Sequence, residues 1–315
     1  MTCNSKRVAS PDTSDPGTFT GKFTIGIPTY NRANLLPRAI DSVLAQQLPV
    51  DLVVLDDGST DQTASVARRY AKSVRYFVQE RNAGLNAARN RILKEALHPW
   101  VFFLDDDDLL RPGSLDRMAS AIASLPAGAC HPVQFFSASN AQVPREFLML
   151  EAAGLMAGTT RGDLLPVIHK ERFRECGFSY PEEIGGEGLL WLRVAQRSPI
   201  PTWNICVTEV GCDAAIRITS VEFQLRHARQ FAELQDRYLA EFADLARRCA
   251  PWMESRRRLG SGLYWLLAGE PAQARSRIRQ RWDRQYWLPA AALYALTWLP
   301  RSCARLALRG YRKIA

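Results

Sequence analysis

The sequence predicts an α/β fold, a mostly parallel sheet with helices on both faces, followed by a helical extension at the C-terminus. Three observations predict it. Short apolar runs alternate with segments of helical periodicity between residues 22 and 124. A polar cluster follows each of the first four apolar runs. From about residue 221 the periodicity is helical to the end of the chain. Strands that alternate with helices at this spacing form a parallel sheet that is covered on both sides.

The expected elements follow one another in a regular order. Four strands are expected at residues 23–28, 50–55, 74–79 and 100–104. Four helices are expected at residues 35–46, 64–71, 84–96 and 115–124, the last with Ser114 as its N-cap. Beyond residue 130 the pattern predicts one strand at 166–170 and a loop that enters a helix at 185–196. In the C-terminal helices, breaks are expected near Pro251, Gly260–Gly262, Pro271, Pro289 and Pro300.

Composition divides the 315 residues into three parts. Residues 1–20 are polar, lack the apolar middle of a signal peptide and are expected to be a disordered leader. Residues 21–220 are expected to form the α/β domain, and residues 221–315 a basic, aromatic-rich helical extension. The seven cysteines are scattered and have no C-x-x-C pair, so we interpret them as reduced thiols of a cytoplasmic protein. The sequence has no run of about eighteen apolar residues, so no membrane span is expected.

Positive charge is concentrated at the C-terminus. The net charge is +9, yet residues 253–315 hold thirteen Lys/Arg against three Asp/Glu. Residues 252–315 hold five of the eight tryptophans. This segment therefore indicates peripheral binding to an anionic membrane surface, or a helical hairpin packed on the α/β domain with solvated arginines; the two are not exclusive. Nucleic acid is not the expected partner, because the aromatic residues cluster with aliphatic ones rather than alternating with basic ones.

Polar clusters follow all four predicted parallel strands, where open parallel sheets bind ligands. They are 28–32 (PTYNR), 56–61 (DDGSTD), 80–90 (ERNAGLNAARN) and 105–108 (DDDD). Any one cluster is equally well explained as a polar loop with helix caps, as for Asp61. Adjacent acids directly after buried strands are costly unless a cation or hydrogen-bond donors compensate them. Such oxygen-rich clusters suit Mg²⁺ or Mn²⁺. The sequence has neither a P-loop nor a G-x-G-x-x-G fingerprint.

Four stretches in this order and spacing resemble the family 2 nucleotide-sugar glycosyltransferases of the GT-A fold. They are TIGIPTYNRANLLPRAIDSVLAQ, LVVLDDGSTDQT, RNAGLNAARN and FFLDDDDLL. The resemblance is close over residues 22–110 and looser to about residue 210. It implies a Rossmann-like sheet, an inverting sugar transfer and a nucleoside diphosphate sugar donor, of the UDP or dTDP type.

The resemblance also implies roles for individual residues. Asp57 matches the acid that holds the donor's pyrimidine, and Asp105 and Asp107 match the two ends of the metal motif. Asp107 is expected to bind Mg²⁺ or Mn²⁺ directly, with Asp105 as a second ligand or a ribose contact. Because side chains alternate along an extended segment, Asp106 is expected to be a solvated spacer, and Asp108 to orient the loop or cap the coming turn. The donor-binding set implied by the resemblance is Pro28, Tyr30, Arg32, Asp57, Asn82, Arg89 and Asp105.

Glu187 is the expected catalytic base. The stretch GGEGLLWLRV ends in Trp191-Leu192-Arg193, and counting back places Glu187 where the family usually has an Asp. Alternatively, Glu187 only begins a helix, where the helix dipole favours an acid. Glu182 and Glu183 are the competing candidates for the base. His169 is interpreted as structural rather than as part of the site.

The resulting prediction is a metal-dependent inverting glycosyltransferase with a glycan or lipid-linked acceptor. The expected setting is cell-surface polysaccharide, lipopolysaccharide or glycolipid synthesis, in the cytoplasm or at the inner face of the plasma membrane. Two alternatives are a catalytically weak nucleotide-sugar-binding scaffold at the membrane and a nucleotidyltransferase on a related sheet.

Overall fold

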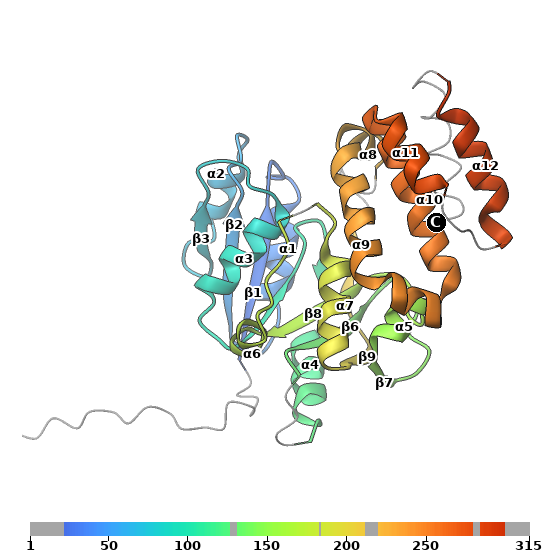
Figure 1. The fold of residues 1–315 in the computed structure, drawn as a ribbon. Helices are drawn as coiled ribbons and strands as arrows, with labels where there is room; N and C mark the ends of the chain where they lie inside the picture. The colour runs from blue at the N-terminus through green and yellow to red at the C-terminus, as the bar shows by residue number, and fades with distance from the viewer. Residues whose placement is uncertain (1–21, 127–130, 183, 212–219, 280–283, 300–315) are drawn as a thin grey trace, which may run out of the picture.

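A nine-stranded mixed sheet forms the core of the chain (Figure 1). The computed structural model describes residues 22–126, 131–182, 184–211, 220–279 and 284–299. The strand order is β3-β2-β1-β4-β8-β6-β9-β5, and β7 pairs with β9. The strands are β1 (Phe23–Thr29), β2 (Val50–Asp56), β3 (Arg75–Val78), β4 (Trp100–Phe103), β5 (Leu109–Leu110), β6 (Val133–Ala138), β7 (Phe147–Leu150), β8 (Leu164–His169) and β9 (Ile200–Glu209).

Helices cover the sheet and extend beyond it. In the first part of the chain they are α1 (Leu36–Leu44), α2 (Thr63–Arg68), α3 (Leu85–Glu95), α4 (Ser114–Ala123), α5 (Ala152–Ala157), α6 (Lys170–Glu175) and α7 (Glu187–Arg197). In the C-terminal part they are α8 (Val221–Arg226), α9 (Ala228–Cys249), α10 (Pro251–Ala268), α11 (Pro271–Ile278), the 3₁₀ turn Arg284–Tyr286 and α12 (Trp287–Leu296).

The four predicted parallel strands are confirmed as one half of the sheet. β1 lies between β2 and β4 with parallel register on both sides, and β3 pairs parallel with β2. The other half is mixed, because β8 runs antiparallel to both β4 and β6 whereas β6 and β9 are parallel. The strand predicted at 166–170 is the end of β8. The sequence pattern did not reveal β5, β6, β7 or β9.

Two hydrophobic cores lie on opposite faces of the sheet. Along β2 the side chains alternate: Leu52 and Val54 belong to the core that contains α1 and α4. Val53 and Leu55 belong to the other core, which contains α3, α5, α7 and the helices from α9 to α12. The prediction of helices on both faces is therefore confirmed.

The C-terminal helices pack beside the sheet, and α12 lies at their outer edge (Figure 1). The expected breaks at Pro251 and Pro271 are confirmed, since each Pro begins a helix, where its missing N–H costs nothing. The break expected at Gly260–Gly262 is wrong. These residues lie inside α10, where a side chain at Gly262 would meet Ile278 at 2.7 Å, so the small residues allow close helix packing. The break expected near Pro289 is confirmed, because α11 ends at Ile278 and α12 begins at Trp287, with Pro289 in its first turn.

Four further expectations concern a helix cap, the two chain termini and membrane spans. Ser114 is not the N-cap of α4: that position is Gly113 at φ 68°, and the Ser114 hydroxyl instead donates to the Val207 carbonyl at 2.8 Å. The leader 1–20 and the break at Pro300 lie outside the described residues. Within the described ranges, no helix is both long enough and apolar enough to cross a bilayer.

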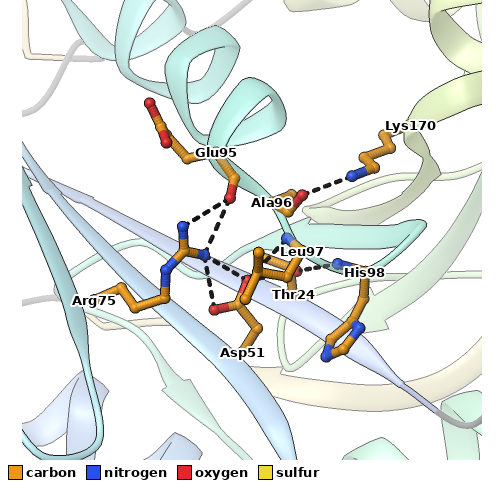
Figure 2. Close-up of polar contacts among 8 residues, drawn as sticks. All are labelled: Thr24, Asp51, Arg75, Glu95, Ala96, Leu97, His98 and Lys170. Atoms are coloured by element: carbon orange, nitrogen blue, oxygen red, sulfur yellow. Dashed lines mark hydrogen bonds and ion pairs between the residues drawn. The ribbon is translucent and has the colours of Figure 1, made fainter. Parts of the chain in front are cut away.

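A polar network fixes the C-terminal end of α3 at the amino ends of the strands (Figure 2). The buried Asp51 carboxylate accepts from the Thr24 hydroxyl at 2.8 Å and from Arg75 at 3.0 Å. Arg75 also donates to the Glu95 carbonyl at 3.0 Å, and Lys170 donates to the Ala96 carbonyl at 2.6 Å. Cations at this position complement the helix dipole. The network therefore orients α3, which carries Arg89 and Asn90 at the opposite edge of the sheet.

Candidate functional site

The loops after β1 and β2 are tied together at the carboxyl edge of the sheet. Asn31 has a left-handed backbone (φ 52°), and its side-chain oxygen accepts from the Thr60 backbone N–H at 2.7 Å. The Asn31 N–H donates to the Ser59 hydroxyl at 2.8 Å. Asp61 accepts from Ala33 N–H at 3.1 Å and from Thr63 N–H at 2.9 Å, so it joins the first loop to the first residue of α2, whose N-cap is Gln62. These residues shape the first two loops.

Asp57 ties the second loop to the third. It is buried at the end of β2 and accepts from the Gln79 side-chain amide at 2.6 Å. It also accepts from the backbone N–H groups of Ala83 and Gly84, each at 2.8 Å. Its neighbour Asp56 accepts from the Tyr76 hydroxyl at 2.6 Å. Both carboxylates therefore accept hydrogen bonds from protein donors, and Asp57 holds in place the loop that leads into α3.

The four acids after β4 lie in a turn rather than in an extended segment. The Asp108 N–H donates to the Asp105 carbonyl at 3.0 Å, which closes the turn. The expected alternation of the four side chains is therefore wrong, because it assumed that the strand continued through them.

Asp106 is not a solvated spacer. It is 2% exposed and accepts from the Arg32 guanidinium at 2.5 Å. Burial raises the pKa of Asp106 to about 6, although the charge of Arg32 opposes that rise. Arg32 also lies 3.4 Å from Asp107. The first loop and the acidic turn are therefore joined by an ion pair.

Asp107 and Asp108 are held from the other side by the segment after β9. The Gly211 N–H donates to the Asp108 carboxylate at 2.8 Å, so Asp108 does orient the loop. Burial raises the pKa of Asp108 to about 7. A side chain at Gly211 would lie 1.9 Å from the Asp107 carbonyl oxygen. Only glycine permits this close approach, which fixes the backbone of Asp107.

Arg89 joins two of the predicted site residues. From α3, its guanidinium donates to the Glu187 carboxylate and, at 3.1 Å, to the Asp105 carboxylate. It lies over the rings of Phe103 and Tyr180, with distances to the ring centroids of 5.7 and 5.5 Å. Burial lowers the pKa of Arg89, but the charges of Glu187 and Asp105 outweigh this effect and raise it. The guanidinium therefore remains a cation between two carboxylates.

Glu187 is the first residue of α7, and that helix is fixed on both sides. The Trp191 ring packs edge-on against Phe135 and Tyr180. Arg193 forms a double hydrogen bond with Glu241 of α9, at 2.8 and 2.6 Å. Glu187 and Asp105 thus accept hydrogen bonds from the same guanidinium, that of Arg89. Of its competitors, Glu182 is exposed, and Glu183 lies outside the described residues.

The remaining predicted residues lie around this group or away from it. Pro28 is buried near the end of β1, Tyr30 is 42% exposed, and Asn82 is exposed in the third loop. His169 lies at the other end of β4, opposite Trp100 in the antiparallel register, and its ring nitrogen accepts from Arg172 N–H at the start of α6. His169 is therefore structural, as interpreted.

Tyr180 and Gly211 are parts of the site that the sequence did not reveal. The Asn90 side chain binds the Tyr180 backbone twice, at 2.9 Å each, which holds the Tyr180 ring beneath Arg89. Neither Tyr180 nor Gly211 lies in a recognisable motif. For Tyr180 the sequence offered one indication, its partner Asn90, which belongs to the third polar cluster.

Two buried polar atoms in this region have no hydrogen-bond partner among the described residues: Arg89 Nε and Tyr180 OH. Buried polar groups are normally paired, so these atoms fit a site that holds water or a polar ligand. In the described ranges, no group of three His, Cys, Asp or Glu side chains is placed to hold a metal ion. The carboxylates of Asp105 and Asp107 fit Mg²⁺ or Mn²⁺ only if phosphate and water oxygens complete the ligand set.

Comparisons with known proteins identify the family of the chain. The profile described as "Glycosyl transferase family 2" matches residues 24–194. A Campylobacter jejuni relative, a GalNAc(5)-diNAcBac-PP-undecaprenol beta-1,3-glucosyltransferase, is 37% identical over 102 residues, which are 31% of this chain and 33% of the relative. The chain matches about a third or less of the length of its curated relatives.

Solved structures share the fold across nearly the whole chain. S. aureus TarS 1-349 in complex with UDP-GlcNAc aligns with a TM-score of 0.54 at 17% identity, over 93% of this chain and 92% of that one. The mannosyltransferase PcManGT from Pyrobaculum calidifontis, in complex with GDP-Man and Mn²⁺, aligns with a TM-score of 0.54 at 20% identity, over 90% and 85%. These similarities show the GT-A fold. Together with the profile match over residues 24–194, they show that the chain belongs to glycosyltransferase family 2.

Proposed function

We propose that the chain transfers a sugar from a nucleoside diphosphate sugar to a hydroxyl acceptor, with inversion at the anomeric carbon. The observation that carries the proposal is the Arg89 bridge. It brings Asp105, at the end of β4, within one ion-pair network of Glu187, at the start of α7. A donor-side acid and a candidate base are thus joined at the carboxyl edge of the sheet, where such folds bind their ligands.

The donor would lie along the first three loops and the acidic turn. Tyr30 is exposed enough to stack on the base, and Asp57 and Asn82 flank the same edge. Arg32 and Arg89 supply positive charge near the diphosphate. TarS and PcManGT bind UDP-GlcNAc and GDP-Man respectively, which supports a nucleotide-sugar donor. We propose a UDP or dTDP sugar.

The transfer needs a proton acceptor and a stabilised leaving group. Glu187 would take the proton from the acceptor hydroxyl as its oxygen bonds to the anomeric carbon. The bond from that carbon to the diphosphate oxygen breaks, and the nucleoside diphosphate leaves with the electron pair. When bound to Asp107 and Asp105, Mg²⁺ or Mn²⁺ would neutralise charge on the diphosphate. Arg89 holds the Glu187 carboxylate in place.

We further propose a glycan or lipid-linked acceptor in cell-surface polysaccharide, lipopolysaccharide or glycolipid synthesis. The name of the Campylobacter relative, which describes transfer to an undecaprenol-linked glycan, supports this proposal. It also agrees with the basic, aromatic-rich C-terminal segment.

A thermal-shift screen of UDP, dTDP and GDP sugars, with and without Mn²⁺, tests donor binding. Turnover of the stabilising donor then tests the reaction. Failure of every nucleotide sugar to stabilise the chain contradicts the proposal. Stabilisation without turnover favours a scaffold, and pyrophosphate release from a nucleoside triphosphate and a sugar phosphate favours a nucleotidyltransferase.

Glu187→Gln tests the base, because it keeps the side-chain length and removes the proton acceptor. We expect turnover to fall while the donor still binds. Glu182→Gln is the matched control, since Glu182 is exposed in the same segment. Equal turnover of Glu187→Gln and the wild type would remove Glu187 from this role.

A further inference from the structure

The solvent-facing side of α12 is entirely apolar. Its exposed side chains recur at helical spacing through the helix and the turn that follows it. Four are large, with exposures between 52% and 68%: Trp287, Leu288, Trp298 and Leu299. The smaller exposed residues between them are Ala291, Ala292 and Ala295. This side of the helix therefore presents a continuous strip with tryptophans near both ends.

The opposite side of α12 is apolar too. Ala290 and Leu293 are buried, and they belong to the core that contains α10 and α11. A surface helix of a globular protein normally has polar residues on its outer side. The helix is therefore apolar on both sides, although only one side is covered by the protein. Figure 1 places α12 at the outer edge of the molecule, away from the sheet.

The segment that contains this strip is strongly basic, and two of its described arginines contact the α12 segment. The last 45 residues, 271–315, contain ten Lys/Arg and one Asp/Glu. Arg275 lies over the Trp298 ring, 4.4 Å from its centroid, and Arg279 donates to the Tyr294 hydroxyl at 2.7 Å. Arg275 belongs to α11 and Arg279 is its C-cap, and their guanidinium groups contact Trp298 and Tyr294. Arginines commonly pack their aliphatic stems on apolar surface and keep the charged end in water.

We propose that the outer side of α12 binds an anionic lipid bilayer surface, with the helix lying in the plane of the interface. Tryptophans, a continuous apolar strip and bordering arginines are the features of helices that insert shallowly at lipid headgroups. Arg275 and Arg279 beside the strip, together with the net positive charge of residues 271–315, complement anionic headgroups. The same net charge in a second copy of the chain disfavours a symmetric dimer through this side. The inference does not depend on the proposed function.

The experiment measures co-sedimentation of the full chain with vesicles of phosphatidylcholine alone and of equal parts phosphatidylcholine and phosphatidylglycerol. We expect binding to the anionic vesicles that weakens with added salt, and little binding to phosphatidylcholine. Leu288→Glu combined with Trp298→Glu places two charges in the strip, and we expect it to weaken binding about tenfold or more.

Leu97→Glu is the matched control, because Leu97 is 64% exposed at the amino edge of the sheet. It should bind as the wild type does, and melting temperatures establish that the variants are folded. The proposal is overturned if the wild type ignores anionic vesicles, or if the double variant binds them equally well. It is also overturned if sedimentation velocity shows a wild-type dimer that the double variant disrupts. Donor turnover without vesicles reports separately on the proposed function.

Discussion

The Arg89 guanidinium donates a hydrogen bond to the Glu187 carboxylate, although the two residues are 98 positions apart in the chain. The same guanidinium donates to Asp105, and its Nε has no partner among the described residues. α3 and α7, which flank the carboxyl edge of the sheet, are therefore connected through one cation. The position of Glu187, the candidate base, therefore depends on Arg89, a residue on the donor side of the site.

Arg89→Lys should reduce turnover more than donor affinity. Lysine keeps the charge but offers a single ammonium, which does not reproduce the forked contact with two carboxylates. We expect kcat to fall about 10²-fold, the scale of a small misplacement of a reacting group. Steady-state kinetics separates kcat from KM. Arg91→Lys on the same helix, whose partner is Glu95, should behave as the wild type. A change in KM alone for Arg89→Lys would contradict the positioning role.

Asp107→Asn and Asp106→Asn should differ in their need for metal. Asp107 is the proposed ligand, so Asp107→Asn should raise the Mn²⁺ concentration for half-maximal turnover by about tenfold or more. Asp106 accepts from Arg32 instead, so Asp106→Asn should raise the donor KM and leave the Mn²⁺ requirement unchanged. Mn²⁺ titrations of donor turnover distinguish the two. Identical titrations for both variants would mean that the metal assignment is wrong.

Gly211→Ala should destabilise the protein and impair turnover. The new methyl group would meet the Asp107 carbonyl oxygen at 1.9 Å, and backbone cannot move aside as a flexible side chain can. We expect the free energy of unfolding to fall by about 1–3 kcal/mol. Gly188→Ala, beside Glu187 in α7, is the control. Nothing lies within 4 Å of its added methyl group, so stability should be unchanged or higher by about 0.5–1 kcal/mol. Chemical denaturation measures both.

Asp236 should contribute stability that disappears in acid. Burial raises the pKa of Asp236, but hydrogen bonds from Arg277, Ser261 and Trp265 outweigh this effect and lower it. The contribution is therefore present above the unfolded pKa of about 3.9 and is lost as pH falls through the lower folded value. Asp236→Asn should cost about 1–3 kcal/mol at neutral pH.

The difference in unfolding free energy between the wild type and Asp236→Asn should shrink as the pH falls below about 4. Denaturation curves at several pH values measure it. Asp244→Asn on the same helix is the control, because its pair with Arg247 is exposed to solvent and should matter little. A pH-independent difference for Asp236→Asn would show that its charge is not the cause.

The half of the sheet that the sequence predicted is the half with a repeated local signal. Each of β1 to β4 ends in a polar loop and a helix separates each of these strands from the next, so parallel order follows from that alternation. β6 and β9 pair with partners distant in sequence, and the ten residues of β9 keep no regular alternation of polar and apolar residues. Their pairing depends on tertiary contacts, which local patterns do not contain.

The errors at the site have the same origin. The sequence shows four equivalent aspartates, and only the turn after β4 makes Asp106 the buried one. Glu187 lies at the start of α7 as predicted, and its role as base stays a prediction. Its contact with Arg89 was not predicted, because a pairing between distant residues leaves no trace in local spacing. Ser114 was misassigned because Gly113 takes the left-handed backbone that ends the preceding turn.

One hydrophobic core contains both sheet residues such as Phe135 and residues of α9 and α10 such as Phe242 and Leu263. During synthesis on the ribosome, the strands and α7 therefore emerge before the helices that cover them. A nascent chain that has reached residue 220 would present a wide apolar surface, the kind that recruits chaperones or aggregates. The C-terminal helices complete the assembly of this face. We therefore expect the loss of these helices to lower the yield of folded protein first, and to affect the reaction rate at the carboxyl edge of the sheet only secondarily.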